Sequence, residues 1–540
     1  MTLAIRIGAA ARLAAGLAVL PGGLLVGQSS SSVTSSGGVP GWLESWSPLL
    51  SRGSLVRHQP YAGLGVATLF LPAPRLGSFW FAGNPAGLVG EIQDSRSDFG
   101  VTLAKRTGTY RRPLDPAGSN LKQATALAWR PLTPRFALLG RVALDQERFD
   151  PGTSADLVEP YPSSPFVTID TSASATRRTR VRLEGVGSWR LGELDLGLSL
   201  GLETLANETI EAGFARRSRL TTPAAKLGFS YLLGSVRLGG YGGWRHRAET
   251  LRLIEIAAQG QAIELQGHHE VPNTDIIGNY YRRFEENTPT AGVSLSGRWG
   301  QTAWTLYGER TWVRERSFRQ ETDDPVTNRW HSNGWASGLA LQRSLSNRML
   351  LTIDGRLARL NGDADLGLDS AGAVFRARER ALIGSTELRV ALDSTHWGLV
   401  VAARVGHENR VREDLTDSLN TRISGLTIGV SVELARALST RVSMTGTLAY
   451  ANYSATSAYP APAVLGQTYR TIVLPELDFM ARQSRPYQGA LGLRWRTRPG
   501  TFLWVVVRGE RLVPVGNNPT PFGPNGSRST ISATVGVTIQ

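Results

Sequence analysis

The chain has 540 residues, no cysteine and a formal net charge of +15, and only three of its 59 basic residues are lysine. The absence of cysteine excludes disulfide frameworks, thiolate metal sites and cysteine nucleophiles. The basic residues are spread along the chain and form no nucleic-acid-binding signature, so we expect no nucleic-acid partner.

The amino-terminal residues 1–27 predict a secretory signal peptide. Arg6 and Arg12 precede an apolar run of small and aliphatic residues. The run is short for a transmembrane helix, and we expect cleavage between residues 27 and 36. Residues 28–94 are then a periplasmic spacer that could serve as a hatch or plug, with a possible short amphipathic helix within 39–50.

From about residue 95 the sequence alternates apolar residues with small or polar ones. In ELDLGLSLG, residues 193–201, the leucines share one face, whereas Asp195, Gly197 and Ser199 share the other. A period of two is the signature of β-strands. Short turns alternate with long polar loops, which is the pattern of a transmembrane barrel and not of a soluble sandwich.

We therefore predict an all-β fold for residues 95–540, a closed antiparallel transmembrane β-barrel of about 18 strands (16–20) in a Gram-negative outer membrane. The segment 251–265 also alternates, and it either extends a hairpin beyond the membrane or adds two strands. The expected strands are 97–109, 121–131, 134–150, 172–190, 193–210, 219–233, 235–250, 288–300, 301–316, 333–345, 348–361, 378–393, 396–411, 422–435, 439–455, 485–497, 500–512 and 529–540.

Aromatic residues are placed where girdles at the two membrane interfaces should lie. One set lies near the short turns, and a second set approaches the long loops. The first set is Trp129, Trp189, Trp299, Trp397, Trp495 and Trp504, and the second is Trp244, Trp312, Trp335, Tyr450 and Tyr453.

Charged residues occupy the strand phase opposite the apolar face, so we predict that they line a wet lumen. Arginine outnumbers carboxylates among them, which favours anions. The alternative is that arginines and carboxylates pair across strands and brace the wall. The predicted lumen residues are Arg182, Glu184, Arg190, Arg237, Arg245, Arg298, Arg310, Asp354, Arg356, Glu387, Arg389, Asp393, Arg404, Glu433, Arg494 and Arg496.

Three segments are candidates to fill this lumen: residues 40–94 and the loops at 250–288 and 455–485. Within the first, FWFAGNPAGLVG contains a turn at Asn84, Pro85, Ala86 and Gly87. Proline fixes φ, and an asparagine side chain can cap its own turn. The turn can therefore hold a chain reversal where a plug meets the wall, or simply tether the amino end.

This turn resembles the Asn-Pro-Ala segment of outer-membrane transporters for long-chain fatty acids and other hydrophobic compounds. In that family a short amino-terminal hatch plugs the barrel, so the resemblance implies a hatch and transport. The family has fewer strands than we count, and its hydrophobic groove has no residue-by-residue match. The same turn, followed by GVTLAKRTGTYRRP from Gly100 to Pro113, also resembles a set of uncharacterised outer-membrane barrels of about this length. This second resemblance is weak but covers more of the chain than the first.

Two clusters contain residue types that can bind metals. His268, His269 and Glu270 lie in a long loop, and Asp363 and Asp365 lie near a glycine. Neither cluster has the ligand number and spacing of a known metal site. We expect no catalytic, cofactor or metal site and no enzymatic activity.

The sequence therefore favours a passive pore or gated transporter for small solutes, with an Arg-rich lumen that favours anions. The alternative is a barrel that docks a partner or assists outer-membrane assembly, and a barrel hydrolase ranks below both. The expected partners are outer-membrane lipid, the outer-membrane assembly machinery and a small solute, whose identity is left open together with the oligomeric state.

Overall fold

The computed structural model describes residues 79, 81–92, 94–155, 164–209, 215–256, 262–266, 269–270, 278–318, 328–366, 373–393, 397–416, 419–459, 466, 469–518 and 520–540. The signal peptide and most of the expected spacer, including 39–50, lie outside these residues.

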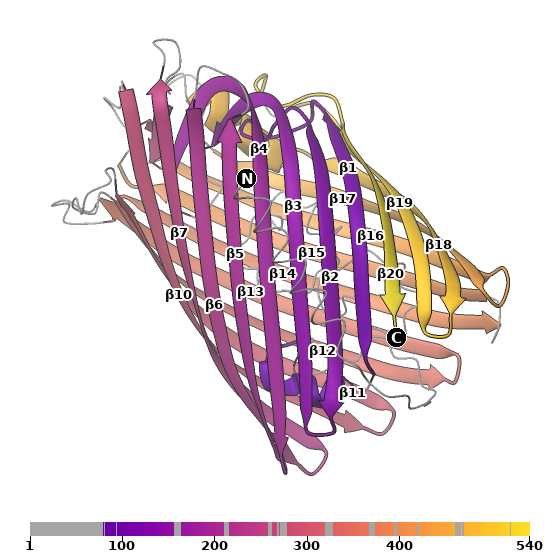
Figure 1. The fold of residues 1–540 in the computed structure, drawn as a ribbon. Helices are drawn as coiled ribbons and strands as arrows, with labels where there is room; N and C mark the ends of the chain where they lie inside the picture. The colour runs from indigo at the N-terminus through magenta and orange to yellow at the C-terminus, as the bar shows by residue number, and fades with distance from the viewer. Residues whose placement is uncertain are drawn as a thin grey trace, which may run out of the picture.

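Eighteen long strands form one closed antiparallel barrel, which confirms the predicted fold class (Figure 1). Each strand pairs with its neighbour in the chain, β7 pairs with β10, and β20 pairs with β1 to close the ring. The strands are β1 (Arg96–Gly108), β2 (Ser119–Thr133), β3 (Phe136–Ala155), β4 (Phe166–Leu191), β5 (Leu194–Thr209), β6 (Ala215–Leu233), β7 (Val236–Ile256), β10 (Gly278–Trp299), β11 (Thr302–Phe318), β12 (Asn328–Ser346), β13 (Met349–Leu366), β14 (Phe375–Asp393), β15 (Trp397–Asp414), β16 (Leu419–Ala437), β17 (Val442–Ala458), β18 (Ser484–Arg498), β19 (Thr501–Pro514) and β20 (Arg528–Ile539).

The ambiguous segment 251–265 is divided between two strands. Its first part continues β7, and its second part forms β8 (Ala262–Gln266), which pairs with the start of β4 and, on its other side, with the short β9 (His269–Glu270). Both short strands lie outside the ring, so the barrel count stays at eighteen. The described helices are η3 (Pro85–Gly87), α3 (Leu88–Glu91), η5 (Tyr469–Val473) and α4 (Leu474–Ala481), and none is long and apolar enough to cross a membrane.

The two faces of the wall differ as the alternation predicts. On β16, Ile428, Val430 and Val432 are 52%, 50% and 45% exposed on the outside, whereas Thr427 on the inside is buried. A closed ring leaves no unpaired strand edge, and an apolar outer face suits lipid. The chain is therefore an outer-membrane β-barrel.

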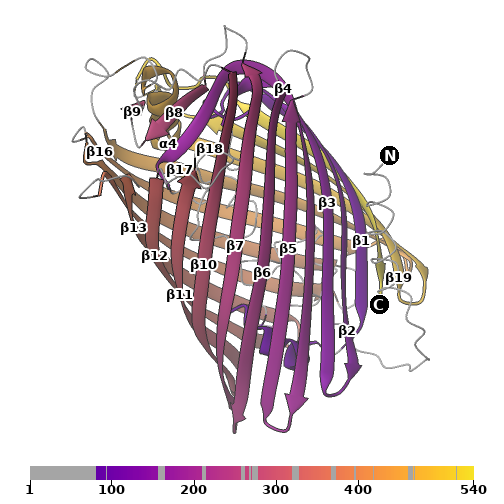
Figure 2. The same cartoon turned by 60° about the vertical axis from the view of Figure 1, so that its left-hand side comes forward.

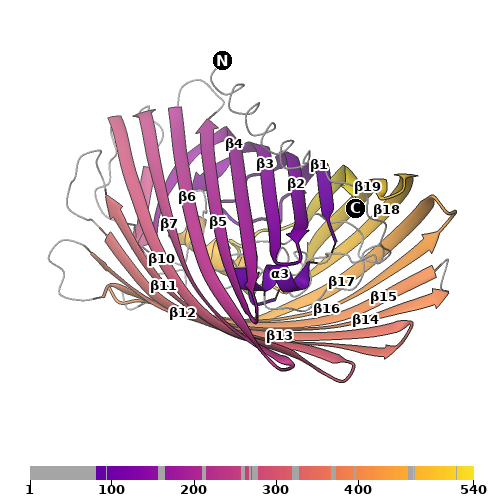
Figure 3. The ribbon, with the colours of Figure 1, turned by 60° about the horizontal axis from the view of Figure 1, so that its bottom comes forward.

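The ring has a short-turn end and a long-loop end, at the bottom and top of Figure 1. Two-residue connections join β4 to β5 and β6 to β7, and Gly234 has a positive φ of 60° in the second of these turns. Glycine adopts this conformation without a steric penalty, which suits tight hairpins. Figure 2 shows β4 curving over the long-loop end beside α4, and Figure 3 shows α3 within the ring at the other end.

Candidate functional site

The charged residues predicted to line the lumen lie in the inward phase of their strands, except Arg310 and Asp393, and the side chain of Asp393 lies outside the described part of the structure. Each of the others alternates with outward apolar side chains and shares its face with buried residues. They are Arg182, Glu184 and Arg190 on β4, Arg237 and Arg245 on β7, Arg298 on β10, Asp354 and Arg356 on β13, Glu387 and Arg389 on β14, Arg404 on β15, Glu433 on β16, and Arg494 and Arg496 on β18.

The predicted lumen position of Arg310 is wrong. On β11 it shares a face with the exposed Leu306 and lies opposite the exposed Trp335, whereas Glu309 on the other face is buried. Near the long-loop end the strands leave the hydrocarbon region, and charge is then tolerated on the outer face. Charge alone therefore does not identify the inward phase at this height.

An acidic residue clamps four neighbouring strands near the short-turn end. Asp195 on β5 is 1% exposed and accepts a hydrogen bond from Arg190 Nε on β4 at 2.9 Å. Its second oxygen accepts from Arg237 Nη1 on β7, and the same nitrogen donates to Ser230 Oγ on β6 at 3.2 Å. Because both arginines share one carboxylate, the clamp joins strands that are not direct neighbours.

Other inward arginines are paired in the same way. Arg182 Nη2 lies 2.7 Å from Asp145 Oδ2, and Arg245 Nη2 lies 2.5 Å from Glu286 Oε1. Arg389 Nε lies 2.6 Å from Glu387 Oε1 on the same strand. These pairs match the wall-bracing alternative, and they reduce the unpaired positive charge in the lumen.

A partly buried lysine, Lys226, connects these charged pairs to the segment of chain that lies inside the barrel. Lys226 Nζ on β6 lies 4.5 Å from the centre of the Tyr241 ring and 3.9 Å from Glu309 Oε2. The Tyr241 hydroxyl donates to Glu309 Oε2 at 2.9 Å, and Lys226 Nζ donates to the Gly83 carbonyl at 3.4 Å. Sequence reasoning missed Asp145, Asp195, Lys226, Glu286 and Glu309 as lumen charges, although the same inward phase marks them.

Residues 79 and 81–92, which we call the inner segment, lie against the inner wall at the short-turn end (Figure 3). Asn84 is fully buried, and its Oδ1 accepts from Ala86 N at 3.1 Å, so it caps η3. Its Nδ2 donates to the Phe229 carbonyl on β6 at 3.0 Å. The single Asn84 side chain therefore both forms the turn and attaches it to the wall.

The wall is hollowed by glycine where it meets this turn. A Cβ at Gly197 of β5 would overlap the backbone of Pro85 and Ala86, and one at Gly228 of β6 would overlap Asn84 Oδ1. A Cβ at Gly239 of β7 would crowd Asn84 Nδ2 at 2.5 Å. We call these three glycines the glycine cradle, because any side chain there would push the turn away.

Both flanks of the turn are packed as well. Toward α3, Leu88 and Val89 pack with Trp129 of β2 and Val186 of β4 in one buried cluster. Ser188 Oγ of β4 donates to the Ala86 carbonyl at 2.8 Å.

On the other side of the turn, Phe81 meets the Tyr307 ring of β11 edge-on at 5.3 Å. The Arg356 guanidinium of β13 lies 4.7 Å from the centre of the Phe81 ring. The inner segment therefore contacts β2 and β4 with one flank and β11 and β13 with the other, so it crosses the lumen.

The long-loop end is covered by η5 and α4, which belong to the predicted loop 455–485. Leu474, Leu477 and Phe479 are buried in a cluster that also contains Ile169 of β4 and Ile423 of β16. These two strands lie far apart in the ring. The helical pair, which we call the cover, therefore bridges distant parts of the mouth (Figure 2).

Polar anchors hold the cover in place. Asp478 is fully buried and accepts from the Tyr459 hydroxyl at 2.6 Å and from Thr520 Oγ1. Arg482 donates to the carbonyl oxygens of Pro524 at 2.8 Å and Gly516 at 2.7 Å. The loop between β19 and β20 is thereby tied to α4.

Two phenols have raised pKa values, Tyr469 in the cover and Tyr459 beside it. Burial, followed by a hydrogen bond to Asp478 and its negative charge, raises the pKa of Tyr459. Burial and then the Asp478 charge raise the pKa of Tyr469 from 10.0 to about 12. Both shifts favour the uncharged phenol in the closed cover.

The beginning of β4 also crosses the mouth. Phe166 is buried against Trp330 of β12, Leu360 of β13 and Phe375 of β14. These residues stand on the opposite side of the ring from the lower part of β4. The arch formed by β4 and β8 therefore shares the mouth with the cover (Figure 2).

Three aromatic assignments are corrected by the structure. Trp189, Trp299 and Trp495 are 43%, 85% and 50% exposed on the outer face, as a girdle requires. Trp129 and Trp504, by contrast, are buried in the inward phase. Tyr453 also points inward, where its hydroxyl donates to the Met480 carbonyl of the cover at 2.6 Å.

Neither cluster considered as a metal site gains support. Asp363 lies on the outer face, and its Oδ1 pairs with Arg376 Nε at 3.1 Å. His268 lies outside the described residues. Within the described ranges, no group of three or more histidine or acidic residues is arranged to hold a metal ion.

No protein-family model and no curated relative matches the chain. Several solved outer-membrane barrels resemble it in structure. The toluene transporter TodX of P. putida is 12% identical with a TM-score of 0.31, over 85% of this chain and 92% of that one. The ferric citrate transporter FecA is 10% identical with a TM-score of 0.42, over 83% and 79%. The copper transporter OprC is 10% identical with a TM-score of 0.39, over 83% and 81%. Likenesses this distant carry no argument about what this chain does.

Proposed function

We propose that this protein is a gated outer-membrane transporter for small solutes, with the inner segment as a hatch at the short-turn end. The observation that supports this proposal most directly is the glycine cradle. Gly197, Gly228 and Gly239 leave a recess that the Asn84–Ala86 turn fills. The wall contributes the absence of side chains, and the turn contributes the hydrogen bond from Asn84 to the wall. A recess matched to one turn is expected where a segment must return to one closed position.

Direct polar contacts attach the hatch to the wall. They include the bonds from Asn84 to Phe229, from Ser188 to Ala86 and from Lys226 to Gly83. Each such bond contributes about 1 kcal/mol. Neither these bonds nor the apolar contacts of the flanks belong to the strand ladder of the barrel, so the hatch can leave while the barrel stays folded.

The lumen carries a weak preference for anions in this proposal. Inward arginines are numerous, but Asp145, Asp195 and Glu286 neutralise several of them. The remaining excess is carried by residues such as Arg298 and Arg496 toward the short-turn end. We expect anions to pass more readily than cations. The selectivity for anions should be smaller than that of a lumen lined by unpaired arginines.

Planar-bilayer conductance of a double-cysteine variant tests the gate. The chain has no cysteine of its own, so Ala86→Cys with Ser188→Cys places a single pair of thiols at the hatch contact, which oxidation can join. Oxidised protein should conduct little, and reduction should restore conductance with a reversal potential that favours anions. The two single-cysteine variants are the controls, and neither should respond to reduction.

Equal conductance of the oxidised and reduced double variant would reject the hatch. The absence of conductance and of solute uptake in every form would reject transport. That second result would favour the alternative of a barrel that docks a partner, for which the specific observation is that the cover and the β4 arch occupy the mouth. Recovery of a stable partner from solubilised membranes would then support docking.

A further inference from the structure

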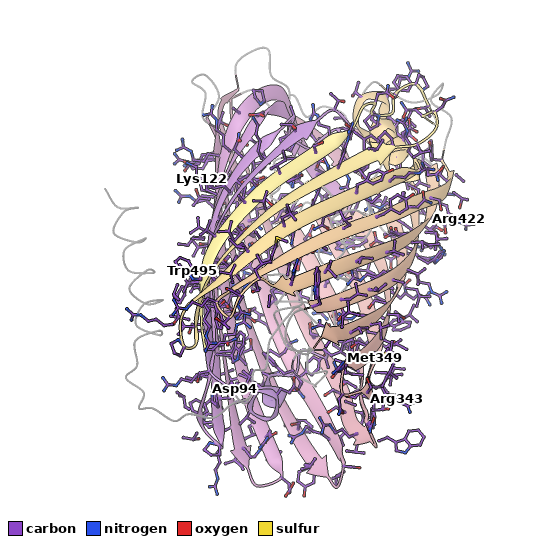
Figure 4. The ribbon with its side chains drawn as sticks, turned by 90° about the vertical axis from the view of Figure 1, so that its right-hand side faces the viewer. Asp94, Lys122, Arg343, Met349, Arg422 and Trp495 are labelled. Carbon is purple, nitrogen blue, oxygen red and sulfur yellow. The ribbon has the colours of Figure 1, made fainter. Side chains whose placement is uncertain are left out.

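A row of arginines crosses the outer face of β11 to β14 at the edge of the apolar belt. In register across these strands lie Arg310, Trp335, Arg359 and Arg380. All four side chains are exposed. A second row lies two residues nearer the long loops. In it, Arg378 on β14 and Arg422 on β16 are in register through Val411 of β15, and Arg422 projects outward in Figure 4.

The row lies at the depth of lipid headgroups. Leu357 and Leu382 are two residues nearer the short-turn end on the same outer face, and they pair with each other across β13 and β14. Two residues span about 7 Å along a strand. The guanidinium groups of Arg359 and Arg380 are therefore within one side-chain length of the hydrocarbon boundary on the long-loop side.

The arginines of the row are poorly compensated by the protein itself. Arg359 and Arg380 are direct cross-strand partners, as are Arg316 and Arg329 nearer the loops. Like charges directly opposite each other destabilise a sheet. Arg359 Nε donates to Asn361 Oδ1 at 3.3 Å, and in the described part of the chain Arg380 has no carboxylate partner.

Nearby carboxylates are already engaged by other arginines. Asp363 pairs with Arg376 at 3.1 Å, and Glu413 lies 3.7 Å from Arg378. An anion supplied from outside would relieve the repulsion between Arg359 and Arg380. Phosphate suits this arrangement because two planar guanidinium groups can each donate paired hydrogen bonds to its oxygens.

We propose that the outer face of β11 to β14 binds a phosphorylated lipid headgroup of the outer leaflet. Arg359 and Arg380 hold the phosphate, Arg310 and Arg378 flank it, and Trp335 packs at the base where acyl chains begin. The lipid is preferred over a soluble anion because the row adjoins an apolar surface that only a lipid can cover. This site is independent of the gate proposed above.

Binding of defined lipids to the full-length protein in detergent, followed by native mass spectrometry, tests the site. The probes are bis-phosphorylated lipid A, the same lipid after enzymatic dephosphorylation, and phosphatidylethanolamine. The test variant is Arg359→Ser with Arg380→Ser. The matched control is Arg343→Ser with Arg441→Ser, which removes two exposed arginines at the short-turn end.

The test variant should bind bis-phosphorylated lipid A about 25-fold more weakly, since each arginine contributes about fivefold at a membrane surface. The control should change affinity by less than about twofold. Arg359→Lys with Arg380→Lys keeps the charge but loses paired donation, and should give an intermediate loss even if the serine variant folds poorly. Equal binding of phosphorylated and dephosphorylated lipid, or equal losses in test and control variants, would overturn the proposal.

Discussion

At Gly197 and Gly228 the barrel wall has no side chain, and the backbone of Pro85 and the amide of Asn84 fill the space. Sequence alternation correctly places Gly197 in the inward phase, beside Asp195. It gives no reason for glycine there, because the contact is with a turn more than 100 positions away in the chain. The need for glycine becomes evident only from the contact between the strand and the turn.

Gly197→Ala should therefore displace the inner segment, whereas Gly201→Ala should not. Both glycines face inward on β5, but a Cβ at Gly201 would meet Ala224 Cβ at an ordinary 3.7 Å. Overpacking at Gly197 costs about 1–3 kcal/mol. With a single reporter cysteine in place of Ala86, the rate of labelling by a thiol reagent should rise about tenfold or more in the first variant only. Equal rates in both backgrounds would contradict the cradle.

At the scale of elements, the strands and the segments that enter the barrel were predictable, but the places where those segments pack were not. Strand limits follow from local alternation and turn residues, so the expected 193–210 closely matches β5. The cover, the β4 arch and the position of the inner segment depend on contacts such as Phe166 with Phe375 or Tyr453 with Met480. Long-range contacts of this kind leave no periodic signal in the sequence.

The same limit explains the errors at single positions. Trp129 and Trp504 lie near short turns, as girdle residues do, but they face inward, and Trp129 packs against the inner segment. Arg310 carries a charge in a barrel strand, yet it lies above the apolar belt on the outer face. In each case the residue type and its distance from a turn fitted the prediction, but the face of the strand on which the side chain lies did not.

The cover should respond to alkaline pH in a defined direction. The pKa of Tyr469 is about 12 in the closed cover and 10.0 for an ordinary tyrosine. The closed state thus favours the neutral phenol, so this contribution to closure is complete below about pH 10 and is lost as pH rises toward 12. In the described structure the Tyr469 hydroxyl has no hydrogen-bond partner, so Tyr469→Phe should preserve packing.

The difference in ultraviolet absorbance between wild-type protein and Tyr469→Phe during a pH titration isolates this phenol. A midpoint near 12 is expected, and a midpoint near 10 would mean that the cover does not bury Tyr469 in solution.

At the scale of the whole molecule, ion pairs inside and outside the ring differ in how much they contribute to stability. Asp195 is 1% exposed and joins arginines from β4 and β7. Asp363 on the outer face is 61% exposed in its pair with Arg376. Pairs exposed to water contribute little to stability, whereas removing a buried acceptor leaves its donors without a partner.

Asp195→Asn should accordingly lower the free energy of unfolding by about 1–3 kcal/mol, and Asp363→Asn should change it by less than about 0.5 kcal/mol. Reversible urea unfolding in lipid vesicles, followed by tryptophan fluorescence, measures both values. Comparable losses in the two variants would show that the inner clamp does not brace the ring.

The seam between β1 and β20 has a consequence for biogenesis. Thr102 and Thr534 share a hydrogen bond of 2.9 Å across it, although they lie 432 positions apart. Until the final strand has been synthesised, a partly paired chain has two unpaired strand edges that can pair with other proteins. The ring of this protein can therefore close only after β20 is available to pair with both β1 and β19.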